Sequence, residues 1–63
     1  MTFTEKDGLI LAKNHREIIV GFVGQNSDGY YFAFGKPSAR SFMAFSCKDA
    51  ETGKEKIKQY WEN

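Results

Sequence analysis

The pattern of apolar and polar positions predicts a series of short strands followed by one helix. The segments LILAK (9–13) and EIIVGFVG (17–24) are apolar and typical of strands, with Asn14-His15-Arg16 as a tight hairpin connection. A helical turn over residues 5–13 is the alternative for the first segment. Residues 1–8 are predicted to be a polar lead-in with Thr4 capping a short turn, and Gly8 argues against a long helix there.

A strong turn signal divides the next apolar segments. QNSDG (25–29) supplies Asn, Ser, Asp and Gly, and it predicts a second hairpin that joins EIIVGFV to YYFAFG. GKPSAR (35–40) is predicted to be a loop, and SFMAFS (41–46) a last strand. If the strands pair in chain order, the sheet is an antiparallel meander.

From Ser46 onward the hydrophobic period changes to that of a helix, predicted over about 48–61. Ser46-x-x-Asp49 and Asp49-x-x-Thr52 are two alternative starts. The positions that recur at helical spacing are Ala50, Gly53, Ile57 and Tyr60 or Trp61. Gly53 costs about 1 kcal/mol relative to alanine inside a helix, and we expect it to face the sheet and permit a close approach.

These elements predict a single domain over residues 1–63, of the α+β class. Its antiparallel sheet has three or four strands in a meander, and its C-terminal helix packs on one face. One helix covers one face only, yet the predicted strands are apolar on both faces, whereas a half-exposed antiparallel sheet should alternate. If Gly24 pairs with Tyr30, one face carries Val20, Phe22, Phe32 and Phe34 and the other carries Ile19, Val23, Tyr31 and Ala33. A slip by one residue would exchange these sets. The second face is therefore expected to be covered by the N-terminal segment or by another molecule.

Composition limits the means of stabilisation. A chain of 63 residues buries only about 60% of the surface that its unfolded form exposes. Cys47 is the only cysteine and His15 the only histidine, so an internal disulfide or a zinc site of about four Cys and His ligands is not expected. No cofactor is predicted.

Catalysis is not predicted either. His15 and Cys47 would need the fold to bring them together, and no third orienting group is evident. A helix N-terminus would lower the pKa of Cys47, although a cysteine in this position is more often a small, half-buried apolar residue. Asp49, Glu51 and Glu55 alternate with lysines, which is typical of a solvated helix face.

Nucleic-acid binding is the alternative function, because aromatic side chains on an open sheet face can stack bases while lysines and arginines hold phosphates. Gly29-Tyr30-Tyr31-Phe32 resembles the aromatic submotif of RNA-recognition and cold-shock domains, which implies base stacking on the sheet. Asp28 stands where those domains have a basic residue, and Tyr31 where they have a small one. The sequence therefore assigns the chain to no family.

The preferred hypothesis is a small non-catalytic binding module that acts through protein–protein contact and self-associates as a homodimer. Interfaces favour aromatic residues, Met and Arg. The candidate contact residues are Tyr31, Lys36, Arg40, Met43 and Trp61. A lone thiol and the lack of a signal-peptide pattern favour a cytoplasmic location. No apolar run approaches the roughly 20 residues that span a bilayer, so no membrane partner is expected.

Overall fold

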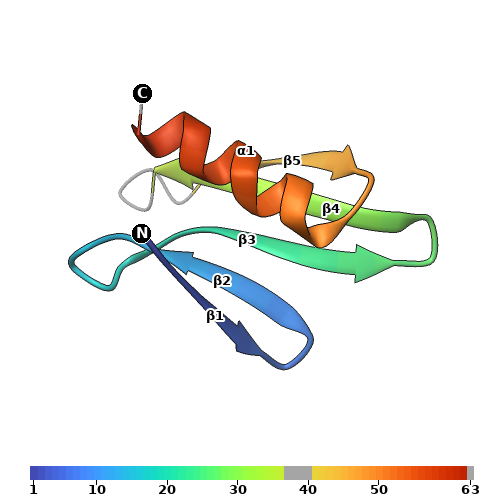
Figure 1. Ribbon diagram of the computed structural model, residues 1–63, viewed down its shortest axis with the longest axis horizontal. Helices are drawn as coiled ribbons and strands as arrows, with labels where there is room; N and C mark the ends of the chain where they lie inside the picture. Colours follow the sequence, from blue (N-terminus) through green and yellow to red (C-terminus); the bar gives the residue numbers. More distant parts are fainter. Residues whose placement is uncertain (37–40, 63) are drawn as a thin grey trace.

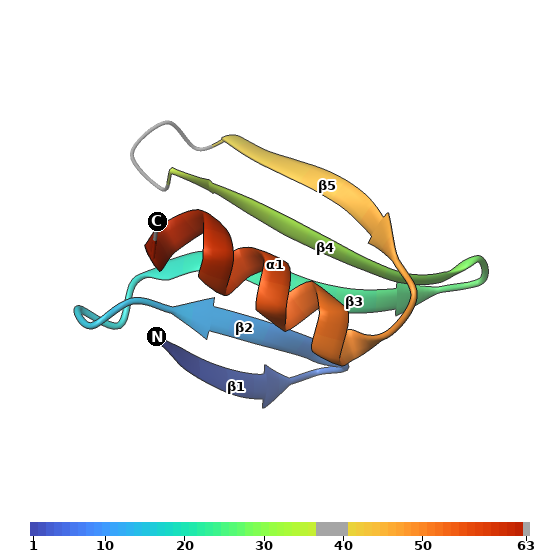
Figure 2. The ribbon, with the colours of Figure 1, turned by 45° about the horizontal axis from the view of Figure 1, so that its top comes forward.

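Five antiparallel strands in chain order and a C-terminal helix make up the computed structural model, which describes residues 1–36 and 41–62 (Figure 1). The elements are β1 (Thr2–Lys6), β2 (Leu9–Lys13), β3 (Ile19–Asn26), β4 (Gly29–Lys36), β5 (Ser41–Cys47) and α1 (Ala50–Glu62). Each strand pairs with the next along the chain, and the helix lies across one face of the sheet (Figure 2). The α+β class and the meander order are confirmed.

The strand count corrects the sequence prediction, because the sheet has five strands instead of three or four. The residues predicted to form a polar lead-in include β1, and Thr4 lies within this strand. Asp7 and Gly8 form the connection to β2 with φ angles of 52° and 83°, the conformation that a two-residue hairpin loop requires. Only Phe3 of β1 is partly buried, so the strand carries little apolar alternation to reveal it.

The hairpin between β2 and β3 is longer than predicted. LILAK is a strand, which excludes the helical turn over 5–13, but β3 begins at Ile19 and not at Glu17. The Asn14 side-chain oxygen accepts hydrogen bonds from the backbone N–H groups of Arg16 and Ile18, at 2.8 and 3.1 Å. Glu17 takes a positive φ of 61°. Asn14 therefore organises a loop from residue 14 to residue 18.

The turn between β3 and β4 is confirmed. Ser27 and Asp28 connect the strands, and the Asn26 side-chain oxygen accepts a hydrogen bond from the Asp28 N–H at 2.9 Å. Lys36 ends β4, and the remainder of the predicted loop 35–40 lies outside the described residues. The last strand extends one residue beyond the prediction, to Cys47.

Strand register decides which side chains share a face. Gly24 pairs with Tyr31, one residue away from the Gly24–Tyr30 pairing, so the slipped alternative is the actual one. We call the face under α1 the helix face and the opposite one the outer face. The larger helix-face side chains are Phe3, Ile10, Val23, Tyr30, Phe32, Phe34, Met43 and Phe45, and the larger outer-face side chains are Leu9, Leu11, Phe22, Tyr31 and Phe42.

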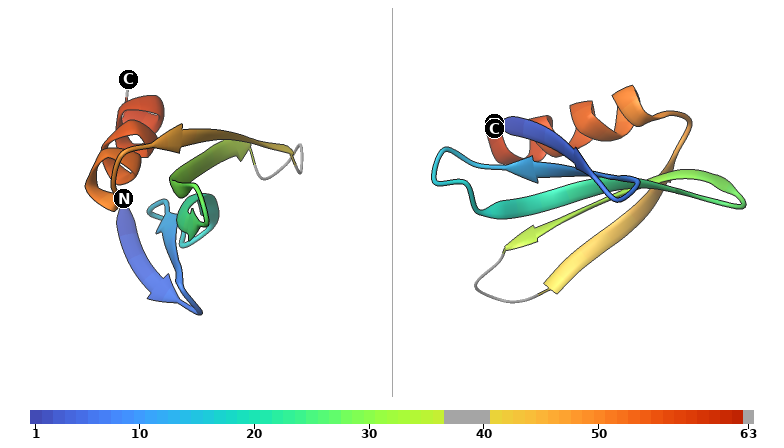
Figure 3. Two further views of the ribbon diagram at one scale, coloured as in Figure 1. Left: turned by 90° about the vertical axis from the view of Figure 1, so that its right-hand side faces the viewer. Right: turned by 90° about the horizontal axis from the view of Figure 1, so that it is seen from below.

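The core lies between the helix and the middle of the sheet, which bends around α1 (Figure 3). It consists of Ala12, Val20, Val23, Phe32 and Ile57. Ile57 has no exposed surface, and it lies directly over Gly21, where an added Cβ would be 3.2 Å from an Ile57 methyl carbon. Burial of such side chains contributes about 25 cal/mol per Å² of apolar surface and is the main source of stability.

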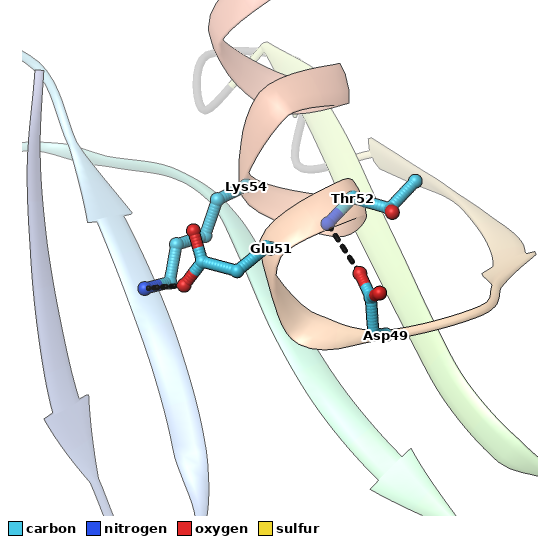
Figure 4. Close-up of polar contacts among 4 residues, drawn as sticks. All are labelled: Asp49, Glu51, Thr52 and Lys54. Atoms are coloured by element: carbon cyan, nitrogen blue, oxygen red, sulfur yellow. Dashed lines mark hydrogen bonds and ion pairs between the residues drawn. The ribbon is translucent and has the colours of Figure 1, made fainter.

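The helix begins where the second of the two alternative starts predicted it. The Asp49 carboxylate accepts a hydrogen bond from the backbone N–H of Thr52 at 2.7 Å (Figure 4), which satisfies one of the orphan donors of the first turn. Lys54 and Glu51 form an exposed ion pair at 3.0 Å, and the Lys54 ammonium lies 5.8 Å from the centre of the Phe3 ring. The helix thus reaches β1 through a long side chain.

Gly53 faces the sheet, as expected. A Cβ at this position would lie 3.1 Å from both methyl carbons of Val23 and 3.3 Å from the Cys47 sulfur. The absence of a side chain lets the first turns of α1 approach β3 and β5 closely.

The N-terminal segment does not cover the outer face, which corrects one of the two expectations. Residues 1–13 form β1 and β2 and extend the sheet; they do not fold over this face. Tyr31 lies across Gly24, where an added Cβ would meet the tyrosine ring at 2.6 Å and Leu9 at 2.8 Å. The Phe22 ring contacts Tyr31 edge-on at 6.2 Å and Phe42 at 6.0 Å. Phe22 and Tyr31 are half-buried by these contacts, whereas Phe42 stays 37% exposed.

Candidate functional site: the open edge of β5 and its aromatic groove

Beyond its contact with Cys47, the helix leaves most of the last strand uncovered. An α-helix is about 10–12 Å wide with its side chains, and neighbouring strands are about 4.8 Å apart, so one helix covers about two strands. α1 packs mainly on β4 and β3. As a result, Met43 and Phe45 on the helix face of β5 are 60% and 42% exposed.

An aromatic groove runs between α1 and this uncovered strand. Phe32, Phe34 and Phe45 stack on one another with ring centres 5.6 to 6.0 Å apart, and Tyr60 of α1 contacts Phe34 at 4.1 Å. The groove has a volume of about 530 Å³, and its lining residues are Phe32, Phe34, Phe45, Ser46, Lys56, Gln59 and Tyr60. Phe45 and Tyr60 are more than 40% exposed and are its accessible rings.

The two edges of the sheet differ in charge. The β1 edge carries Glu5 and Lys6, which is how natural sheets discourage pairing with another chain. β5 has the sequence SFMAFSC, with no charged residue. Three of its large side chains are exposed, Phe42, Met43 and Phe45, at 37%, 60% and 42%. An uncharged, apolar edge strand is a template for strand addition.

Hairpin geometry shows which backbone groups of β5 face away from the sheet. Asn26 pairs with Gly29 across a two-residue turn, and the residues that close such a turn direct their N–H and C=O groups at each other. Because the direction alternates along β4, the N–H and C=O groups of Phe32 and Phe34 point toward β5. There Phe32 pairs with Phe45, and Phe34 pairs with Met43. The intervening residues of β5 have their N–H and C=O groups on the free edge: Phe42, Ala44 and Ser46.

The thiol of Cys47 is not activated. Burial raises the pKa of Cys47 above its ordinary value of 9.0, and the negative charge of Asp49 raises this pKa further. The thiol donates a weak hydrogen bond to the Asp49 carbonyl at 3.3 Å. The lowered pKa considered from the sequence is therefore wrong, because desolvation outweighs the stabilising N–H groups of the helix start. Cys47 is the half-buried packing residue that was the alternative.

The side chains that could act in catalysis or bind a metal lie far apart. The loop that carries His15 lies at the end of the sheet opposite the β5–α1 connection (Figure 2), so His15 and Cys47 do not meet. Within residues 1–36 and 41–62, no three His, Cys, Asp or Glu side chains gather closely enough to hold a metal ion.

Of the five residues singled out from the sequence, Tyr31, Met43 and Trp61 lie in different parts of the described structure. Met43 is exposed beside the groove, whereas Tyr31 is half-buried on the outer face. Trp61 is half-buried on the last turn of α1, and its indole N–H is buried without an acceptor among the described residues. Lys36 is the last residue of β4, and Arg40 lies outside the described residues.

Sequence reasoning did not single out Phe45 and Lys56, which line the aromatic groove together with Tyr60. A signal existed for Phe45, because it lies two residues after Met43 and both therefore share a face of the last strand. Tyr60 was one of two candidates for the buried helix stripe, and the structure places Trp61 in that stripe and leaves Tyr60 45% exposed. Only the position of the helix over β3 and β4 reveals that these residues meet.

Comparison of the chain with known protein families, curated proteins and solved structures finds no match. In the described part of the chain, no helix has the length and apolar character needed to cross a membrane.

Proposed function

We propose that the protein is a small non-catalytic binding module that self-associates and acts through protein–protein contact. The observation that carries the proposal is the uncharged edge of β5, where Phe42, Met43 and Phe45 are exposed beside backbone groups that pair with no strand of the described residues. Such an edge is a liability unless another chain covers it, because it favours unspecific pairing. A partner strand satisfies both the backbone groups and the apolar side chains.

The exposed area agrees with a weak but specific contact. At exposures of 37%, 60% and 42%, Phe42, Met43 and Phe45 offer roughly 250–300 Å² per copy, taking about 200 Å² for each fully exposed side chain. With the backbone edge and the groove rim, two copies would bury on the order of 1,000 Å², the lower end for a specific interface. We therefore expect a dissociation constant in the micromolar range.

Sedimentation velocity over a micromolar concentration series tests the proposal. We expect a monomer–dimer equilibrium for the natural chain and a monomer for Phe45→Lys, since the substitution places a charge at the exposed edge. The matched control is Thr4→Lys on the edge strand β1, which should leave the equilibrium unchanged. A natural chain that stays monomeric at the highest concentration overturns the proposal.

Binding of single-stranded nucleic acid is the second candidate, because Lys56 lines the groove beside the exposed rings of Phe45 and Tyr60. Stacked bases and one phosphate would use these groups. Affinity for oligonucleotides should then fall steeply with salt, and Tyr60→Ala and Lys56→Ala should weaken it while Lys6→Ala does not. Absence of binding at low salt excludes this candidate.

A further inference from the structure

The free edge of β5 is nearly symmetric about its central residue. The strand runs from Ser41 to Cys47, so Ala44 is its midpoint. The backbone groups on the free edge belong to Ala44 and, on either side of it, Phe42 and Ser46. An antiparallel copy of the strand placed on a two-fold axis at Ala44 would meet these groups with its own, in the hydrogen-bonded spacing.

We propose that two copies of the chain join through β5 in this register, with Ala44 opposite Ala44 of the second copy. This inference rests on the proposed self-association and specifies its geometry. Phe42 then pairs with Ser46 of the second copy, and all the outward-facing backbone groups of the strand are satisfied. A shift of the axis by one residue toward either end leaves part of the edge unpaired.

Side chains fit the same register. On the helix face, Met43 lies directly opposite Phe45 of the second copy, in the non-hydrogen-bonded spacing where Cα atoms are about 4.5 Å apart. These two are the exposed apolar side chains of that face of β5, at 60% and 42%. On the outer face, the small Ala44 meets itself on the axis without steric conflict. Each Phe45 would be covered by a methionine at the mouth of the aromatic groove.

The absence of charge on β5 makes a second copy an acceptable occupant. In the antiparallel pairing about Ala44, only Ala44 lies opposite its own copy, and every other residue of β5 lies opposite a different, uncharged residue of the same strand. β5 carries no charge, whereas the β1 edge has Glu5 and Lys6. The dimer would be one continuous ten-stranded sheet with both helices on the same face, the strand count being twice the five of one copy.

Disulfide trapping tests the register. In a Cys47→Ser background, Ala44→Cys should form an intermolecular disulfide quickly under mild oxidation, because paired Cα atoms about 5.5 Å apart are within disulfide reach. Phe42→Cys should not, since its two copies would be about 14 Å apart along the strands. Thr4→Cys, at the midpoint of β1, is the control for pairing through the other edge.

Hydrogen exchange on the natural chain provides a second measurement that needs no substitution. The amides of Phe42, Ala44 and Ser46 should become protected as concentration rises, while those of Phe3 and Glu5 on the free edge of β1 remain fast. A dimer in sedimentation with neither the Ala44→Cys disulfide nor this protection refutes the register and leaves self-association standing. A chain that is monomeric throughout refutes both.

Discussion

At the scale of single residues, glycines decide where large side chains can lie. Gly24 on the outer face makes room for the Tyr31 ring, and Gly21 on the helix face makes room for Ile57. An aromatic ring over a strand glycine covers backbone that would otherwise be open to water. Tyr31 was predicted as a contact residue, and its position over Gly24 gives it a role within the fold.

Replacing Tyr31 separates these two roles. We expect Tyr31→Ala to lower the free energy of unfolding by about 2–3 kcal/mol, because the substitution exposes Gly24 and removes the contacts with Leu9 and Phe22. Tyr31→Phe keeps the ring and should remain close to the natural chain in urea denaturation. Sedimentation should be unchanged for both variants. Loss of self-association in Tyr31→Ala with unchanged stability would instead make Tyr31 a contact residue.

Adding a methyl group at Gly21 or Gly53 tests close packing under the helix. A Cβ at Gly21 would lie 2.6 Å from the Ala33 carbonyl oxygen, a backbone atom, so we expect Gly21→Ala to destabilise the fold by about 2–3 kcal/mol. At Gly53 the neighbours are side-chain atoms at 3.1 Å or more, and alanine gains about 1 kcal/mol of helix propensity. Gly53→Ala should therefore cost less than Gly21→Ala in denaturant titrations. The reverse order contradicts this account.

At the scale of elements, the helix is well specified by its sequence and the first strand is not. α1 has a capping residue, a stripe of small and apolar positions facing the sheet and charged residues elsewhere. β1 has one half-buried side chain, Phe3, because an edge strand of a meander contributes little to the core. The Asp7-Gly8 pair was the available signal for its hairpin.

The cap of α1 gives the helix a pH dependence. The side-chain hydrogen bond with Thr52, together with the backbone bond to the same residue, lowers the pKa of Asp49 below its ordinary value of 3.8. A carboxylate with a lowered pKa in the folded state stabilises the fold above its unfolded-state pKa, and this contribution disappears as the pH falls through the folded-state pKa.

Asp49→Asn measures that contribution, because asparagine keeps a side-chain oxygen as helix cap but does not titrate. We expect the natural chain to have the higher thermal midpoint at neutral pH, and the difference to close as the pH falls to about 2. Thermal melts of both chains, followed by circular dichroism across this pH range, measure the difference in midpoint. Glu55→Gln on the same helix is the control. A difference that stays constant with pH refutes the electrostatic role of Asp49.

At the scale of the whole molecule, five strands are too many for one short helix. The helix covers the centre and leaves β5 with an apolar edge and a groove beside it. The edge at β1 carries Glu5 and Lys6, which discourage pairing with a strand of another chain. The asymmetry between the edges is the reason that a second copy is expected at β5.

A dimer makes stability depend on concentration, because a partner that binds only the folded chain shifts the unfolding equilibrium. We expect the thermal midpoint of the natural chain to rise over a hundredfold concentration range, and that of Phe45→Lys to stay constant. Thr4→Lys should behave like the natural chain. Equal, concentration-independent midpoints for all three proteins would argue against a folded-state dimer.

Local patterns in the chain were sufficient for the class of the fold, the meander, the second hairpin and the helix with Gly53 toward the sheet. These features depend on neighbours in sequence, on period and on turn chemistry, so they can be inferred without a structure. The pairing register of Gly24, the cover over Tyr31 and the meeting of Phe45 with Tyr60 depend on residues distant in the chain. A shift of one residue in register exchanges the faces of a strand, and the helix has room over only two strands. The tertiary structure alone therefore determines these three features.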